Sequence, residues 1–178
     1  MFEQLQELNK QANRIETEYW VNHDLFSWQW WFIVIINLLF LVLLILFMDK
    51  QRIQIITIAF LFSFILVGIV NELGSFYGWW SYPHQFITAL KTMNAVDFLT
   101  VPVIITLFYQ TFGKWKIYLI TTTVFFLILS FVGIPIFVYF DFYKLHTWNY
   151  FYSFLTLLLV SILVKLFTDF IITKSKSL

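Results

Sequence analysis

Five long apolar stretches dominate this sequence and constrain its fold more than any other feature. Each is close to the ~20 residues that an α-helix needs to cross the hydrocarbon of a bilayer. A backbone surrounded by lipid must satisfy its own hydrogen bonds, so these stretches are predicted to be helices. Period-two alternation, the mark of a membrane strand, is absent. The stretches run from about Trp28 to Met48, Ile53 to Glu72, Asn94 to Phe112, Ile117 to Phe140 and Tyr150 to Ile172.

Composition agrees with a lipid environment. Of the 178 residues, 61% are hydrophobic and 12% are charged, which is more apolar surface than a small soluble domain could bury. The 11 basic and 10 acidic residues nearly balance, so charge gives no indication of a nucleic-acid partner and none is expected. The absence of Cys excludes disulfides, thiolate metal sites and Cys nucleophiles. The bilayer is therefore the one partner that composition predicts directly.

Basic residues are concentrated on one side of a five-span layout. Because positively charged loops stay in the cytoplasm, that side is predicted to be cytoplasmic, with the N-terminus outside and the C-terminus inside. The expected fold is an all-α, polytopic membrane helical bundle of about five transmembrane helices over residues 25–172, followed by a basic cytoplasmic tail, 173–178. The inner group is Lys50, Arg52, Lys114, Lys116, Lys165, Lys174 and Lys176, and the outer group is Lys10, Arg14, Lys91 and Lys144.

Residues 1–24 are expected to form an amphipathic surface helix. They lack the basic start and short apolar core of a cleaved signal peptide. Five acids outnumber two bases, so anionic lipid would not attract the segment. Packing at the interface against the outer loops and recognition of a partner both stay open. The apolar stripe is Phe2, Leu5, Leu8, Ala12, Ile15 and Tyr19.

Polar and aromatic residues gather in the predicted outer half, which is where a small ligand would bind. An ordinary aromatic belt at the headgroup level explains the Trp and Tyr residues equally well. Gly74, Gly78 and Pro83 are interpreted as turn residues of the outer loop. The ligand- or ion-binding candidates are Glu72, Trp79, Trp80, Tyr82, His84, Asp97, His146 and Trp148.

Two acids, Glu72 and Asp97, lie near the outer ends of consecutive stretches. Antiparallel neighbours could bring both carboxylates to one depth, where a proton could be held and released. Anchoring of the helix ends in headgroup water is the alternative. Pro102 and Pro135 are expected to kink or end their helices. No HExxH or other close His spacing occurs, so no metal and no cofactor are predicted.

The remaining polar residues of the stretches have structural interpretations. Asn37 is expected to hydrogen-bond a neighbouring helix. Lys165 and Asp169, four residues apart, are expected to pair while the lysine extends toward water. Neither position is therefore assigned to a binding site.

A family resemblance covers about residues 72–170. The pattern resembles a family of small multipass membrane proteins of endospore-forming Firmicutes, whose members have no established function. Members often carry an acid before the second proline, where this chain has Ile134. The resemblance implies a bacterial plasma-membrane protein and supplies no substrate. It is carried by Asp97-Phe98, Pro102, Tyr109-Gln110, Trp115-Lys116, Ser130-Phe131, Pro135, Tyr143, Trp148, Tyr152-Ser153-Phe154 and the YGWWSYP stretch from Tyr77 to Pro83.

The leading functional expectation is an integral membrane protein without a catalytic motif, acting as an accessory subunit or a small-ligand-binding protein. A membrane-protein partner or a second copy of the chain would suit the accessory role. One alternative is a small transporter or ion- or proton-conducting protein that uses Glu72 and Asp97. Another is a membrane-embedded enzyme built on His84, His146 and the two acids.

Overall fold

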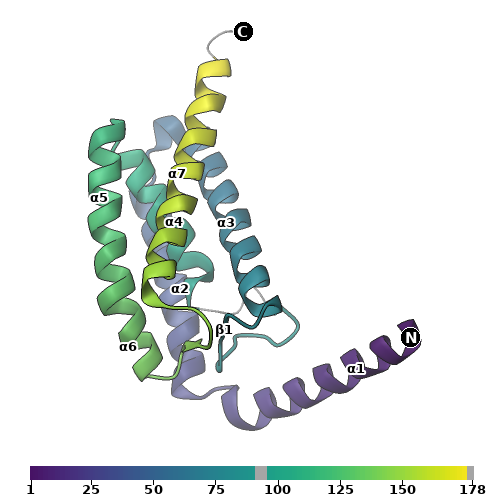
Figure 1. The fold of residues 1–178 in the computed structure, drawn as a ribbon. Coiled ribbons are helices and arrows are strands. Elements are labelled where there is room, and N and C mark those ends of the chain that lie inside the picture. Colours follow the sequence, from purple (N-terminus) through teal and green to yellow (C-terminus); the bar gives the residue numbers. More distant parts are fainter. Residues whose placement is uncertain (91–95, 176–178) are drawn as a thin grey trace.

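The computed structural model describes residues 1–90 and 96–175 as an all-α bundle with one projecting helix (Figure 1). The projecting helix leaves the bundle at one end, and the last helix ends at the other (Figure 1). The elements in order are α1 (Phe2–Tyr19), η1 (Trp20–Asp24), α2 (Trp28–Phe47), η2 (Lys50–Arg52), α3 (Ile53–Phe76), β1 (Trp80–Ser81), α4 (Asp97–Thr111), α5 (Trp115–Ile128), η3 (Leu129–Gly133), α6 (Ile134–Tyr139), β2 (Lys144–Leu145) and α7 (Tyr150–Ser175).

Within the described residues, four helical segments are long and apolar enough to cross a membrane. They are Trp28–Phe47, Lys50–Phe76, Trp115–Tyr139 and Tyr150–Ser175. Each matches one of the apolar stretches of the sequence, which confirms the membrane-type helical bundle. The third stretch corresponds to α4, which is shorter, and its expected start at Asn94 lies outside the described residues, as do Lys91 and Lys176.

The shorter helix α4 is the central element of the bundle. It contacts α2, α3, α5 and α7, and Val103, Ile105 and Thr106 are fully buried. The peripheral helix α2, by contrast, buries only Ile33 and Leu44. Helix α4, which carries Asp97, is thus enclosed by other apolar helices, and such enclosure is how bundles of membrane type tolerate polar side chains.

Both ends of α4 are hydrogen-bonded by neighbouring elements. Asn37 Oδ1 on α2 accepts a 3.0 Å bond from the Leu99 backbone N–H, one of the first-turn donors that a helix leaves free. At the other end, Arg52 Nη2 donates to the Gln110 carbonyl at 3.0 Å, and Gln110 Nε2 donates to the Phe47 carbonyl at 2.7 Å. The expected bond from Asn37 to a neighbouring helix is confirmed.

One face of α3 carries a line of small or polar residues. Ala59, Ser63, Val67, Asn71 and Gly74 recur every three or four positions, and all are buried. Small side chains let helices approach closely where lipid offers no hydrophobic driving force. This face packs against α4 and α7.

Lys165 on α7 is buried, and the expectation that it extends toward water is wrong. Only 1% of its side chain is exposed, because Nζ finds its partners inside the bundle. It donates to the Gly113 carbonyl at 3.0 Å and pairs with Asp169 Oδ2 at 3.3 Å, so the expected pairing is confirmed. Its ammonium also lies 5.1 Å from each of three ring centroids, those of Tyr109, Trp115 and Tyr118.

Helix α1 extends away from the bundle at the end where β1 and β2 pair (Figure 1). None of its residues is buried. Phe2, Leu8 and Ile15 of the apolar stripe are each at least 60% exposed, so the stripe is open to whatever surrounds the protein. A helix is present within the expected range 1–24; what covers its stripe stays a prediction.

Candidate ligand-binding cavity

A cavity of about 230 Å³ lies among α2, α3, α4, α6, α7 and the paired strands. An engineered cavity of ~150 Å³ in another protein holds benzene, so this space accommodates a ring and a short substituent. Most of its lining is apolar, and its polar groups are few. The lining is Ile36, Phe40, Val70, Asn71, Trp80, Tyr82, Val96, Asp97, Thr100, Val101, Ile104, Leu129, Ile134, Phe137, Phe142, Tyr143, Trp148, Ser153, Thr156 and Leu157.

Asp97, in the first turn of α4, forms the polar end of the cavity with Asn71 and Tyr82. Its Oδ2 lies 3.0 Å from the Tyr82 hydroxyl, and its Oδ1 accepts a 3.4 Å bond from Asn71 Nδ2. The Tyr82 hydroxyl also lies 3.1 Å from Asn71 Oδ1. Three segments therefore meet at one carboxyl group: the end of α3, the strand region and the start of α4.

Glu72 does not join this cluster. Its side chain is exposed and does not line the cavity, whereas the preceding residue, Asn71, is 4% exposed and does. Successive residues of an α-helix point about 100° apart, so Asn71 and Glu72 cannot share the inner face. The expected carboxylate pair is replaced by an amide and a carboxyl group.

Aromatic rings form one wall of the cavity. Trp80 and Trp148 meet edge to face with centroids 5.0 Å apart, and the Tyr82 and Tyr143 rings lie 5.3 Å apart. Trp79 stacks on Trp148 at 4.9 Å but does not line the cavity. The candidates Trp79, Trp80, Tyr82 and Trp148 are therefore brought together, and three of them reach the cavity.

Burial raises the pKa of both phenols at this wall, those of Tyr82 and Tyr143. The nearby Asp97 carboxyl group is a second cause, because a negative charge disfavours a phenolate. Both phenols therefore stay neutral and can act as hydrogen-bond donors at any physiological pH.

The two candidate histidines lie apart from the cavity lining. His84 Nδ1 donates to Asp24 Oδ1 at 2.9 Å, and His146 Nε2 lies 3.0 Å from Ser81 Oγ. The His146 backbone N–H donates to the Trp79 carbonyl beside the β1–β2 pair. Among residues 1–90 and 96–175, no three His, Asp or Glu side chains lie close enough to hold a metal ion.

The two prolines lie in helices on either side of the cavity. Pro102 is buried inside α4, five positions after Asp97, and its carbonyl accepts a 2.7 Å bond from Thr106 Oγ1. Pro135 opens α6, directly after the wider π-type turn η3. Pro lacks a backbone N–H, so a break in the α-type ladder at η3 avoids an unsatisfied bond.

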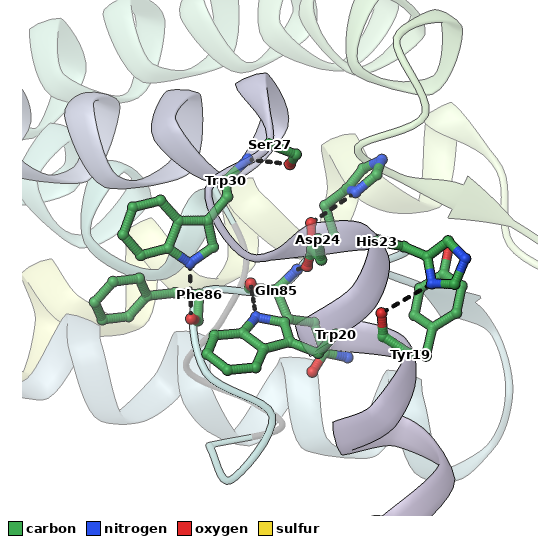
Figure 2. Close-up of polar contacts among 9 residues, drawn as sticks. Tyr19, Trp20, His23, Asp24, Ser27, Trp30, Gln85 and Phe86 are labelled. Carbon is green, nitrogen blue, oxygen red and sulfur yellow. Dashed lines mark hydrogen bonds and ion pairs between the residues drawn. The ribbon is translucent and has the colours of Figure 1, made fainter.

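A clasp of polar contacts holds the 84–86 segment to the start of the chain (Figure 2). Asp24 Oδ2 accepts from the Gln85 backbone N–H at 2.6 Å, next to the His84 bond. Trp20 Nε1 donates to the Gln85 carbonyl at 2.8 Å, and Trp30 Nε1 donates to the Phe86 carbonyl at 3.0 Å. This clasp anchors the stretch that follows Tyr82.

Replacing Asp24 by Ala is expected to loosen residues 82–86 and to destabilise the protein by about 2 kcal/mol. The reason is that Asp24 is 2% exposed, so its removal leaves the Gln85 N–H and the His84 ring without their buried acceptor. Hydrogen exchange of the full chain in detergent should show faster exchange at 82–86. Arg14→Ala is the control, because its ion pair with Glu18 is largely exposed and contributes almost nothing. Equal exchange in both variants would contradict the clasp.

Sequence reasoning missed Asn71, Tyr143, Phe142 and Asp24. For Asn71 a signal was present: the small-residue periodicity of α3 passes through position 71 and not 72. Gly74 and Gly78 were both interpreted as turn residues, but only Gly78, with φ +63°, is one. Gly74 lies inside α3, where a Cβ would overlap the Trp80 indole ring, so its role is close approach and not a turn.

No protein-family model, curated protein or solved structure matches this chain. The cavity is therefore the feature that indicates a function.

Proposed function

We propose that this chain is a bacterial plasma-membrane protein and that it binds a small, mainly apolar molecule with one polar head group. The observation that carries the proposal is Asp97 at the end of a mostly apolar, aromatic-walled cavity. Ligand sites are typically apolar hollows with a few polar groups that fix orientation. An in-span acid that merely anchored a helix end would face headgroup water instead.

The proposed arrangement in the bilayer has five spans, with α4 as the short one. At 15 residues α4 is about 22 Å long, less than the ~30 Å hydrocarbon core. Its neighbours α2, α3 and α7 cover it, so it need not meet lipid along its full length. The basic residues of η2 and of the α4–α5 turn then face the cytoplasm, and the cavity opens in the outer half.

The alternative functions keep less support. A transporter using Glu72 and Asp97 would retain only Asp97 at the cavity, because Glu72 is exposed. A membrane-embedded enzyme would need His84 and His146 beside the acids, and each histidine is engaged elsewhere. An accessory role is compatible with the open stripe of α1, but nothing at that stripe indicates a partner.

A binding measurement on the full chain in lipid nanodiscs tests the proposal. Three radiolabelled probes of one shape are used in equilibrium dialysis: phenethyl alcohol, phenethylammonium and hydrocinnamate. At least one should bind saturably. Replacing Ile104, which lines the cavity, by Trp should weaken that binding at least about tenfold, because the indole fills the space.

The control is the same substitution on the lipid-facing side. Ile120 on α5 is 55% exposed, and Ile120→Trp should leave binding unchanged. Saturable binding that both variants retain would place the ligand elsewhere. Absence of saturable binding for all three probes would reject the proposed function.

A further inference from the structure

We infer that the cavity takes a monovalent organic cation, which binds at Asp97 in exchange for a proton. This inference rests on the proposed ligand site and adds the chemical class of the ligand.

Charge comes first. Of the described residues that line the cavity, Asp97 alone carries an ionisable group with a formal charge at neutral pH. Its two hydrogen-bonding neighbours, Asn71 and Tyr82, are both neutral. Asp97 is partly buried, and no described residue of the lining offers it a positive partner, so a proton or a cation at its carboxyl group is favoured over a bare negative charge.

The aromatic wall favours the same class of ligand. Trp80, Tyr82, Tyr143 and Trp148 all line the cavity, and the electron-rich faces of such rings attract cations and repel anions. A bare metal ion would need several oxygen ligands in place of its water shell. Rings, aliphatic chains and one carboxylate suit an alkylammonium group better than an inorganic ion.

Hydrogen-bond counting indicates how the proton takes part. The Tyr82 hydroxyl lies within hydrogen-bond distance of Asp97 Oδ2 and of Asn71 Oδ1, yet it has one proton to donate. The phenol is placed as the donor in both contacts, and one proton cannot make two full bonds at once. A proton on Asp97 removes this conflict, because Oδ2–H then donates to the phenol oxygen while the phenol donates to Asn71. The observed geometry therefore fits an Asp97 that holds a proton before a cation binds.

Cation binding reverses this arrangement. The proton leaves Asp97 for bulk water, the ammonium group takes its place beside the carboxylate, and Tyr82 O–H turns to donate to Oδ2. Charge is conserved in the exchange, because one positive charge enters the cavity as one leaves. Within the described part of the chain, the titratable groups that face Asp97 are the phenols of Tyr82 and Tyr143, and both stay neutral.

The experiment uses the same nanodiscs with benzyltrimethylammonium, whose charge does not depend on pH. Its affinity should fall at least about tenfold from about pH 8 to about pH 4, as protons compete for Asp97. In weakly buffered solution, where Asp97 is protonated before the ligand is added, binding should release up to about one proton per ligand. Phenethyl alcohol should show neither effect.

Asp97→Asn should lower the affinity for benzyltrimethylammonium at least about tenfold, abolish its pH dependence and leave phenethyl alcohol binding within about threefold. Glu72→Gln is the matched control, because Glu72 is an exposed acid next to the cavity residue Asn71. Its affinity for benzyltrimethylammonium and the pH dependence of that affinity should equal those of the wild-type protein. If Asp97→Asn does not fold, the probe preferences and proton release of the wild-type protein still decide the question.

The outcomes separate this inference from the proposed function. Saturable binding of the alcohol or of hydrocinnamate in preference to both cations would overturn the cation assignment and leave the cavity a ligand site. Cation binding that ignores pH and Asp97→Asn would also overturn it. Failure of every probe would reject the site as a whole.

Discussion

Asp169→Leu is expected to lower the free energy of unfolding by about 3 kcal/mol, although Asp169 is itself 35% exposed. The reason lies in its partner. Lys165 is 1% exposed, so removal of the carboxylate leaves an ammonium charge inside the bundle with only the Gly113 carbonyl and aromatic rings around it. Breaking one side of a buried ion pair costs more than removing both sides.

Variants of the lysine provide the control. Lys165→Met removes the buried charge, keeps a chain of similar length and leaves Asp169 partly in water, so it should cost less than about 1.5 kcal/mol. The double variant Lys165→Met/Asp169→Leu should be more stable than Asp169→Leu alone. Equilibrium unfolding in mixed detergent and SDS micelles measures all three. A cost for Asp169→Leu no greater than that for Lys165→Met would contradict the buried-charge account.

Gly74→Ala should destabilise the protein by about 2 kcal/mol and disturb the cavity wall. A Cβ at position 74 would overlap the six-membered ring of Trp80. Trp80 is 4% exposed and is held between Trp148 and Tyr143, so it has little room to move aside. Overpacking of this kind costs about 1–3 kcal/mol.

Gly68→Ala is the matched substitution on the same helix. Nothing lies within 4 Å of a Cβ at that position, so only the helix preference of Ala acts there and stability should rise by up to about 1 kcal/mol. Unfolding of both variants in mixed micelles gives the stabilities. A change in Trp fluorescence relative to wild type, to which Trp80 is one of eight contributors, reports a disturbed aromatic wall. Equal stabilities would show that the approach of Trp80 to α3 is not tight.

The positions of Glu72 and Asn71 show the limit of sequence reasoning at the site. An acid at the end of an apolar stretch attracts attention because its burial is costly, while an adjacent Asn does not. Which of the two faces inward depends on the rotation of α3, and that is decided by where Ala59, Ser63 and Val67 pack. The side chains that fix this rotation are spread over several turns of α3, so the two adjacent residues alone could not show which of them faces inward.

Lys165 shows a second limit. A lysine near the end of an apolar stretch predicts a side chain that reaches water, since this is the usual way to keep its charge solvated. Here, α4 and α5 supply three rings, and the turn between them supplies a carbonyl group at the same place. Those groups come from positions 109–118, more than 40 residues away in the chain, so local spacing could not indicate them.

The sequence by itself determined that the chain is a bundle of apolar helices, because the length of each stretch and the need to satisfy the backbone in lipid leave few other folds. It also indicated the region of the candidate site, since Trp80, Tyr82, Asp97 and Trp148 all line one cavity. The tertiary structure alone decided that α4 is central, that Asn71 replaces Glu72 and that Lys165 is enclosed. These outcomes depend on helix rotation and on contacts between distant segments. The pattern of hydrophobicity along the chain contains almost no information about either.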